Sequence, residues 1–244
     1  MARTPARNRL ASETDDSTPQ PQEVVQMIIP PLQQITMPVR ITGTSPYMQL
    51  RFSQKAMNKM KATQEAGQQA RSKRTREARD FADDYLQAMH RMDDHPEEAL
   101  SSYGIPAAAF RNAMISACRT IGFKMTLAKL SIFVEQDGLD RIDGTPLVRL
   151  HGEPEMTILP VRNATGVADL RVRPMWREWH ADLRIRFDRQ QFSTVDIYNL
   201  LVRAGAQVGI GEGRPDSRQS AGLGYGLYSV SYVTELPGDL PVAA

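Results

Sequence analysis

Apolar and polar residues alternate most regularly in the segment WHADLRIRF at residues 179–187. Trp179, Leu183 and Phe187 fall on one side of this segment, and the positions between them are polar or charged. A period of two is typical of a strand that buries one face. Shorter apolar runs predict further strands at 39–43, 130–135 and 225–233, and one or two strands at 147–159.

Two segments of the chain have the spacing of apolar residues or the end signals that are typical of helices. Between Pro106 and Gly122 the apolar residues recur at intervals of three and four, which predicts an amphipathic helix that starts near Pro106 and ends at Gly122. Ser193, with Asp196 three residues later, predicts a capped second helix that ends at Gly205.

The predicted elements follow the order strand, helix, strand, strand, helix, strand, with insertions. This order is that of a split βαβ unit. It predicts an α+β, ferredoxin-like (RRM-like) antiparallel sheet with a helical insertion and a Gly-rich loop before the last strand. Helices can cover one face of such a sheet and leave the other face free for a ligand.

The chain is predicted to consist of an arm, one domain and a tail. Residues 1–37 are rich in Pro, Gln, Ser and Thr and lack periodicity, which predicts a flexible N-terminal arm with a docking strand at 24–29. Residues 38–233 are predicted to form a single α+β domain with a polar, helical insertion at about 61–103. Residues 234–244 are predicted to form a flexible tail.

Composition limits the class of protein. Hydrophobic residues make up 41% of the 244 residues, which is enough for a buried core. No run approaches the roughly 18 apolar residues of a membrane span, and the N-terminus lacks the apolar region of a secretory signal. The single cysteine, Cys118, excludes an internal disulfide and a thiolate zinc site. These features predict a cytoplasmic protein without a membrane partner.

Charge is distributed unevenly behind a net charge of +2. Residues 51–79 carry nine basic and two acidic side chains, whereas residues 80–100 carry seven acidic side chains and one basic side chain. Residues 160–190 carry seven arginines and four acidic residues. Basic clusters are typical of proteins that bind a polyanion. Alternatively, the first two segments lie on neighbouring helices and neutralise each other.

Seven of the 16 glycines lie within residues 204–226, between the second helix and the last strand. Glycine permits positive φ and close approach of backbone amides to a ligand, and guanidinium groups suit phosphate. Neither a dinucleotide fingerprint nor a P-loop pattern occurs here. We interpret the loop as a backbone cradle for a nucleic-acid strand, the alternative being an irregular connection without a binding role. The candidate binding residues are Gly209, Gly211, Gly213, Arg214, Arg218, Gly222 and Gly224.

Arginine and aromatic residues alternate in the segment that precedes WHADLRIRF. Arg171, Arg173 and Arg177 surround Trp176, and Tyr228 lies in the last predicted strand. Charge that follows the backbone and a ring that stacks on a base suit single-stranded nucleic acid. We therefore add these five residues to the candidate site. The alternative is that the tryptophans belong to the core and the arginines are solvated.

Signals for catalysis are poor. The four histidines lack metal-ligand spacing, and no hydrolase motif occurs. Asp169 fits a salt bridge better than a metal site, and Glu212 fits a role in shaping the loop better than that of a general base. The sequence therefore predicts no catalytic residue, no metal, no cofactor and no enzymatic activity.

Three runs resemble a known family: VRITGTSPYMQLRFSQKAMNKM, ATGVADLRVRP and VGIGEGRP…GLGYGLYSV. Across residues 38–233 the chain resembles a family of phage- and prophage-encoded proteins. That family in turn resembles the RAMP superfamily, specifically the backbone subunits of CRISPR effector complexes. The resemblance implies a ferredoxin-like core, a thumb-like insertion that 164–177 would match, and polymerisation along a guide RNA.

The resemblance also assigns residues. It matches the Gly-rich loop that holds the RNA backbone to Gly209, Gly211, Gly213, Arg214, Gly222, Gly224 and Gly226. The tip aspartate with which some of these subunits cleave RNA has no secure counterpart, Asp169 being the candidate.

Three functions follow from these patterns, in descending order of support. The first is a non-enzymatic binder of single-stranded RNA or DNA that forms a homo-oligomer or filament along the strand. The alternative is a phage virion structural or assembly protein that uses its N-terminal arm for contacts between subunits. The third is a metal-dependent ribonuclease that uses Asp169 or Glu212.

Overall fold

The computed structural model of the chain contains two compact units, Met1–Pro31 and Leu32–Ala244. The description below concerns the second unit. The structure describes residues 29–65, 79–92, 102–162, 166, 168–217 and 222–233. The predicted tail, and the predicted docking strand apart from Ile29, lie outside the described residues.

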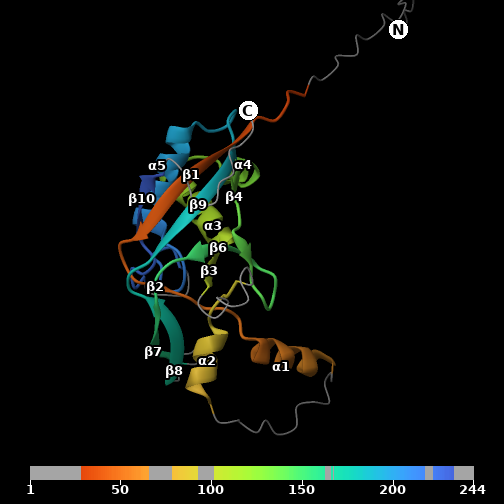
Figure 1. Ribbon diagram of the computed structural model, residues 1–244, viewed down its shortest axis with the longest axis vertical. Coiled ribbons are helices and arrows are strands. Elements are labelled where there is room, and N and C mark those ends of the chain that lie inside the picture. Colours follow the sequence, from red (N-terminus) through yellow and green to blue (C-terminus); the bar gives the residue numbers. More distant parts are fainter. Residues whose placement is uncertain are drawn as a thin grey trace, which may run out of the picture. The chain divides into compact units, whose positions relative to one another are not determined.

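The central element is a four-stranded sheet, which is antiparallel throughout. Its strands, in spatial order, are β10 (Tyr228–Tyr232), β1 (Gln34–Gly43), β9 (His180–Asp188) and β4 (Ile132–Val134). Along the chain, α3 (Ala107–Ala117) lies between β1 and β4, and α5 (Thr194–Arg203) lies between β9 and β10 (Figure 1). The predicted α+β class is thus confirmed.

Strand β1 begins at Gln34, so the last four residues of the predicted arm belong to the sheet. Ile35 and Met37 continue the inward-facing alternation of the residues that follow, and Met37 is buried. Pro38 is tolerated because β10 pairs with β1 only from Val39 onward, so β1 has a single neighbour at the proline. The arm was predicted too long because that proline hides the alternation.

The core lies between the sheet and the two helices. On β9 the predicted alternation is confirmed, since every second side chain is fully buried. These side chains pack with Phe110 and Met114 of α3 and with Ile197 and Leu201 of α5. Burying an aliphatic or aromatic side chain of this size contributes about 1.5–3 kcal/mol. Cys118 is buried in the same cluster.

The helix ends follow their sequence signals. Ser193 and Asp196 form a reciprocal capping box at the start of α5. Pro106 is the N-cap of α3 and offers no side-chain acceptor. A short 3-10 turn, η2 (Cys118–Ile121), extends α3 to Gly122, which has a φ of 68°. Helix α5 continues into a π-helical turn, η3 (Ala204–Val208), which the sequence did not predict.

Two smaller sheets complete the fold. One contains β2 (Tyr47–Met48), β8 (Ala168–Trp176) and β7 (Pro154–Arg162), in that order. The other contains β3 (Tyr103–Pro106), β6 (Pro146–Leu150) and β5 (Gly138–Leu139). The predicted strand region 147–159 therefore divides into two strands, and the arginine-rich segment forms β8.

Three further helices surround this frame. Helix α1 (Gln54–Glu65) buries none of its residues and projects from the body, whereas α2 (Phe81–Gln87) lies beside β8 (Figure 1). Helix α4 (Met125–Ser131) leads into β4. Much of the predicted insertion, including 66–78 and 93–101, lies outside the described residues.

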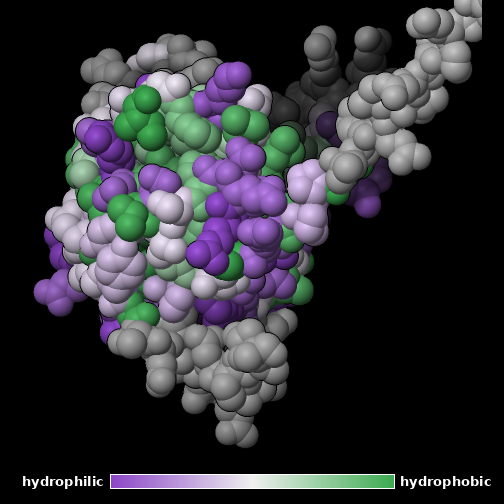
Figure 2. Space-filling model, turned by 90° about the horizontal axis from the view of Figure 1, so that it is seen from above, coloured by the Kyte–Doolittle hydropathy of each residue, from purple (hydrophilic) through white to green (hydrophobic). Residues whose placement is uncertain are grey.

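Hydrophilic and hydrophobic residues both lie on the surface of the molecule. Figure 2 shows hydrophilic residues in a band across one end of the molecule, with hydrophobic residues beside it. Within the part of the chain that the structure describes, no helix combines the length and the apolar character needed to span a membrane.

Candidate functional site

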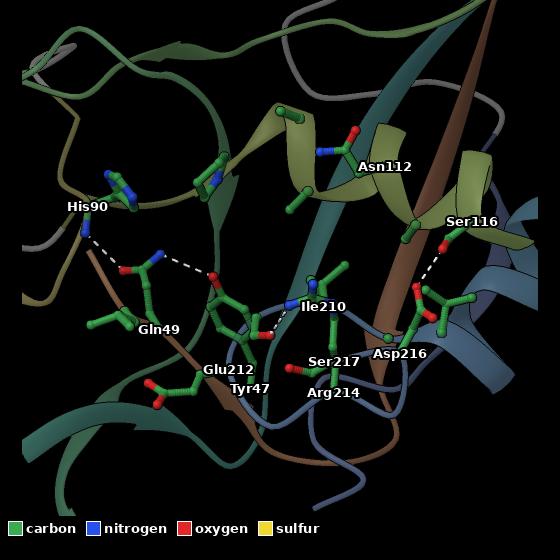
Figure 3. A pocket seen from close by; sticks show the side chains of 18 of the residues that line it. Tyr47, Gln49, His90, Asn112, Ser116, Ile210, Glu212, Arg214, Asp216 and Ser217 are labelled. Carbon is green, nitrogen blue, oxygen red and sulfur yellow. Dashed lines mark hydrogen bonds between the residues drawn. The ribbon is translucent and has the colours of Figure 1, made fainter. Parts of the chain in front are cut away.

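A cavity of about 630 Å³ lies between the Gly-rich loop and α3 (Figure 3). The wall from α3 consists of small side chains, Ala108, Ala109 and Ala113, together with Asn112 and Ser116. The opposite wall is backbone-rich, because Gly209, Ile210 and Gly211 contribute to it. The cavity is therefore bounded by small side chains on one wall and by exposed main chain on the other.

Backbone hydrogen bonds fix the Gly-rich loop in place. Ile210 N–H donates to Gly226 O over 3.0 Å, which joins the two arms of the loop. Glu212 N–H donates to Met48 O over 2.9 Å, and Gly226 N–H donates to Pro46 O over 2.8 Å. The loop is therefore held against the β1–β2 connection.

Two glycines are required by this packing. A Cβ at Gly226 would lie 1.8 Å from Ile210 O, and a Cβ at Gly211 would lie 2.5 Å from Met48 O. Both residues also have positive φ, 70° and 77° respectively. Any other residue at these positions would push the backbone segments apart.

Several N–H groups around the cavity have no acceptor. The N–H groups of Gly211 and Arg214 donate to no acceptor among the described residues. Helix α3 has no side-chain cap, so the first-turn N–H groups of Ala108 and Ala109 are also open. Open amides and the positive end of a helix dipole favour an anion.

Arginine side chains add positive charge. Arg171 and Arg214 line the cavity, and Arg214 Nη1 donates to Gly211 O over 3.0 Å. The remaining guanidinium donors of Arg214 have no acceptor among the described residues. The cavity therefore combines the positive charge of these two arginines with open donors from the loop and from α3.

Each of the two cavity carboxylates is paired with an arginine. Arg173 donates its Nε proton to Glu212, and Asp216 accepts hydrogen bonds from Ser116 and Arg119. Burial raises the pKa of Asp216, but these hydrogen bonds and the charges of Arg119 and Arg214 lower that pKa overall. Both carboxylates are therefore held by bonds within the protein; Arg171 Nη1 also lies 4.0 Å from Glu212 Oε1, and Arg214 uses one of its donors for Gly211 O.

The far end of the cavity is formed by Tyr47, Gln49 and His90. The Gln49 amide donates to Tyr47 Oη over 3.1 Å and to Gly104 O over 2.7 Å, and its oxygen accepts from His90 N–H over 2.8 Å. Burial raises the pKa of the Tyr47 hydroxyl. Gln49 is thus a fixed support and is not free to bind a ligand.

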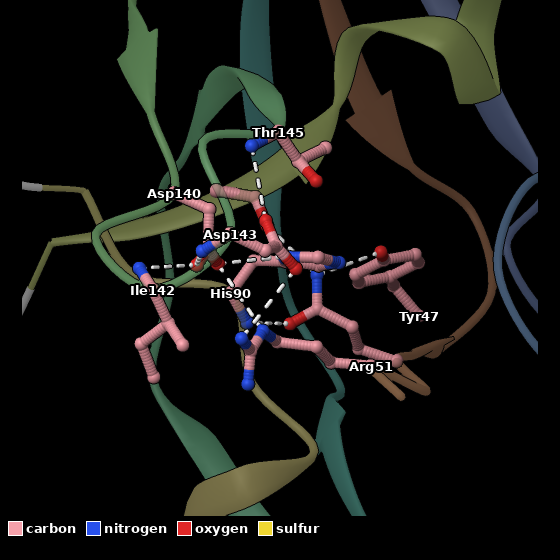
Figure 4. A network of polar contacts seen from close by, with 9 residues as sticks. Tyr47, Arg51, His90, Asp140, Ile142, Asp143 and Thr145 are labelled. Carbon is pink, nitrogen blue, oxygen red and sulfur yellow. Dashed lines mark hydrogen bonds and ion pairs between the residues drawn. The ribbon is translucent and has the colours of Figure 1, made fainter. Parts of the chain in front are cut away.

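A buried ionic network lies behind this end of the cavity (Figure 4). His90 Nδ1 lies 2.8 Å from Asp140 Oδ2. Arg51 Nε lies 3.5 Å from the same oxygen, and Arg51 Nη2 lies 3.4 Å from Asp143 Oδ2. The side chain of Arg51 is 1% exposed.

This network has the donor set of a small metal site, because His90, Asp140 and Asp143 can bring ligand atoms within 4.8 Å of one another. The guanidinium of Arg51 already supplies the positive charge to both carboxylates. Burial raises the pKa of Asp143, but hydrogen bonds from Thr145 and the charges of Arg51 and His90 lower it overall. The cluster is therefore held together by ion pairs, although the three guanidinium nitrogens of Arg51 make no hydrogen bond among the described residues.

Two predicted aromatic contacts are wrong. Trp176 is fully buried and packs against Tyr47 and Tyr103, with ring centroids 5.6 and 5.5 Å apart. Tyr228 is 3% exposed and meets Phe110 edge to face. Alternate side chains of a strand point to opposite faces of its sheet, and Trp176 and Tyr228 lie on the faces that are turned towards the core. Neither ring can therefore stack on a base.

The remaining predicted residues divide into four groups. Arg171, Gly209, Gly211 and Arg214 line the cavity. Arg173 and Gly213 lie behind it, one bonded to Glu212 and the other buried against Tyr225. Arg177 pairs with Glu155, and Gly222 and Gly224 lie further along the loop. Arg218 lies outside the described residues.

Residues that sequence reasoning missed are those of α3 and of the 47–50 segment. Their sequence signal is weak, although Pro106 without a Ser, Thr or Asp beside it does mark an uncapped helix start. The two acidic residues weighed as catalytic candidates, Asp169 and Glu212, both form ion pairs with arginines. Asp169 pairs with Arg79 over 3.1 Å, and Glu212 holds the loop to β8.

No family model matches the chain, and no curated protein matches it. The chemistry of the cavity is therefore inferred from the residues that line it.

Proposed function

We propose that the protein is a non-enzymatic binder of single-stranded nucleic acid, whose sugar–phosphate backbone lies in the cavity between the Gly-rich loop and α3. The observation that carries this proposal is the set of open backbone donors on a cavity that also contains Arg171 and Arg214. Amides and guanidinium groups bind phosphate without reading the base. Because Trp176 and Tyr228 are buried, the contacts are to the backbone, and little sequence preference is expected.

The dimensions of the cavity favour one strand. A volume of about 630 Å³ lies in the range of pockets that hold small molecules. A nucleotide-sized unit of a strand fits a space of this volume. The wall of alanines from α3 leaves room for the backbone next to the loop amides.

We also infer that the central sheet is a ferredoxin-like split βαβ unit. Its chain order is β1, α3, β4, β9, α5 and β10, and its spatial order is β10, β1, β9 and β4. The Gly-rich loop enters the last strand, and the β7–β8 hairpin is inserted before β9. These positions support the resemblance to RAMP backbone subunits as part of the proposal.

The test is a salt titration of binding, measured by the fluorescence anisotropy of a labelled single strand. Each neutralised phosphate contributes about −0.7 to the slope of log affinity against log salt. Arg171→Ala and Arg214→Ala should each make the slope shallower by about 0.7 and weaken binding equally for all sequences.

The matched control is Arg203→Ala, which removes the same charge from the last turn of α5, outside the cavity lining. Its slope should equal that of the wild-type protein. No binding at low salt, or an equal loss in the Arg203→Ala variant, would refute the proposal.

A further inference from the structure

Strand β7 is the outermost strand of its sheet, and its outer edge is open. The spatial order is β2, β8 and β7, so β7 pairs with a neighbour on one side only (Figure 1). Among the described residues, the only bond from the backbone of β7 to another element, apart from the ladder with β8, is the one that Pro154 O accepts. Edge strands of soluble monomers are usually short, covered or protected by a charged side chain.

The direction of the backbone groups on this edge follows from the neighbouring strand. Pro174 O of β8 accepts the N–H of the residue that follows β2 over 3.2 Å, so the backbone groups of Pro174 point towards β2. Those of Arg173, one residue earlier, therefore point towards β7, where Arg173 lies opposite Thr157. The N–H and C=O groups of Met156 and Ile158, on either side of Thr157, consequently point away from the sheet.

The side chains at these two open positions are apolar. Met156 is 44% exposed and Ile158 is 47% exposed. They share a face of the hairpin with Leu170 of β8, which is 46% exposed and lies opposite Pro160. Neither open position carries the charge that would discourage another strand from pairing here.

Prolines limit the open part of the edge at both ends. Pro154 and Pro160 lie at equal distances in sequence on either side of Thr157. Neither has an N–H to donate. Pro154 O is already satisfied, because it accepts the hydroxyl of Tyr85 over 3.1 Å. Between the prolines, the outward donors are therefore the N–H groups of Met156 and Ile158.

An antiparallel second copy of the same strand complements this edge in one register. If Thr157 lies opposite Thr157 of the second copy, Met156 faces the second copy's Ile158, and the N–H and C=O groups of both residues are bonded in both copies. Pro154 then faces the second copy's Pro160, where no N–H requires an acceptor. A shift by two residues in either direction places a proline opposite Met156 or Ile158 and leaves a C=O without a donor.

We propose that two copies of the protein associate by antiparallel pairing of their β7 edges, which joins two three-stranded sheets into one sheet of six strands. The inference goes beyond the proposed function, because this contact requires no nucleic acid. The contact is isologous and closes with two copies, whereas a filament along a strand needs head-to-tail contacts. Because the ladder between the prolines is short, the dimer depends on protein concentration.

Sedimentation velocity of the full-length protein, freed of nucleic acid, tests the association at concentrations up to about 1 mM. The wild-type protein should show a dimer fraction that rises with concentration. Ile158→Lys places a charge on the open edge and should sediment as a monomer throughout. The matched control is Leu130→Lys, which makes the same kind of change at an exposed side chain of α4 and should leave the dimer fraction unchanged. Equal melting temperatures of the two variants show that both are folded.

Cysteine cross-links test the register. Residues that face each other in a non-hydrogen-bonded antiparallel pair have Cα atoms about 4.5 Å apart, which a disulfide can span. The native Cys118 is buried, so mild oxidation reports on introduced cysteines. Thr157→Cys should give a covalent dimer. Glu155→Cys should not, because the register separates the two copies of residue 155 by roughly 14 Å along the strands. A mixture of Glu155→Cys and Leu159→Cys proteins should cross-link, because these positions face each other.

A wild-type protein that stays monomeric at every concentration overturns the inference. A dimer that persists in Ile158→Lys, or that cross-links through Glu155→Cys alone and not through Thr157→Cys, assigns the contact to another surface or register and overturns it as well. None of these results alters the salt titration of nucleic-acid binding, so the two proposals can fail separately.

Discussion

Arg173 of β8 donates its Nε proton to the carboxylate of Glu212 and thereby joins the Gly-rich loop to the β7–β8 hairpin. Arg173 is 9% exposed, so the bond is shielded from water. The pair fixes one wall of the cavity and at the same time offsets the negative charge of Glu212. Two segments 39 residues apart in the chain depend on each other through this contact.

Replacing Arg173 by alanine should therefore loosen the loop. The change leaves the partly buried Glu212 without its donor, which costs about 1–3 kcal/mol of stability. Urea unfolding measures this loss, and hydrogen exchange should show reduced protection of Ile210 and Glu212 N–H. Arg177→Ala is the control, because Arg177 is exposed and pairs with Glu155 at the surface. Equal exchange rates in both variants would contradict the role of the pair.

A pair of glycine substitutions tests the close packing inside the loop. Gly224 and Gly226 both have positive φ, 73° and 70°, so alanine brings about 1–2 kcal/mol of backbone strain at either position. Only at Gly226 would the new Cβ also collide with Ile210 O; at Gly224 it meets nothing within 4 Å. Thermal unfolding should therefore show a larger loss for Gly226→Ala than for Gly224→Ala. Equal losses would mean that the contact between the loop arms is unimportant.

The ionic network behind the cavity should be essential for stability. Arg51→Ala removes the cation from two carboxylates, and breaking a buried ion pair in this way costs about 3–5 kcal/mol. Asp143→Ala should cost less, because the side chain of Asp143 is 28% exposed. Urea unfolding compares the two. Because Arg51 supplies the positive charge, added Zn²⁺ or Mg²⁺ should leave the melting temperature unchanged. A rise would indicate that a metal displaces the arginine.

The stability of the fold should depend on pH through a stacked histidine pair. The rings of His151 and His180 lie 4.5 Å apart and nearly parallel. Burial, together with the charge of His180, lowers the pKa of His151 below its usual value of 6.5. Below pH 6.5 the unfolded chain is protonated first, so stability should fall as pH decreases towards the lower folded pKa.

Urea unfolding at several values between pH 7.5 and 5 measures this dependence. His151→Gln, which does not titrate, should have a flatter profile in that window. A variant as steep as the wild-type protein would assign the pH dependence to other groups.

Local sequence signals predicted much of the fold because their causes are local. The alternation of Leu183 and Phe187 and the capping pair of Ser193 with Asp196 each depend on neighbours a few residues away. The burial of Trp176 depends on Tyr47, which lies far away in the sequence. The segment around Trp176 contains no residue that indicates this contact.

One wall of the cavity could likewise be predicted from the sequence, and the other could not. Glycine clustering and Arg214 pointed to the loop, and the loop does line a cavity. The other wall, from α3, could not be predicted, because nothing in its alanines indicates which element faces them. The tertiary arrangement alone brings Ala108 and Ala109 opposite Gly211.

The alanine wall of α3 gives independent control over the width of the cavity. Ala108 is exposed and Ala109 is half-buried, so larger aliphatic residues at these two positions would narrow the cavity without removing an arginine. The width of the cavity thus depends on the α3 side chains, whereas its arginines come from the loop and from β8. A series of side chains of increasing size at Ala108 therefore changes the width of the cavity while its arginines stay the same.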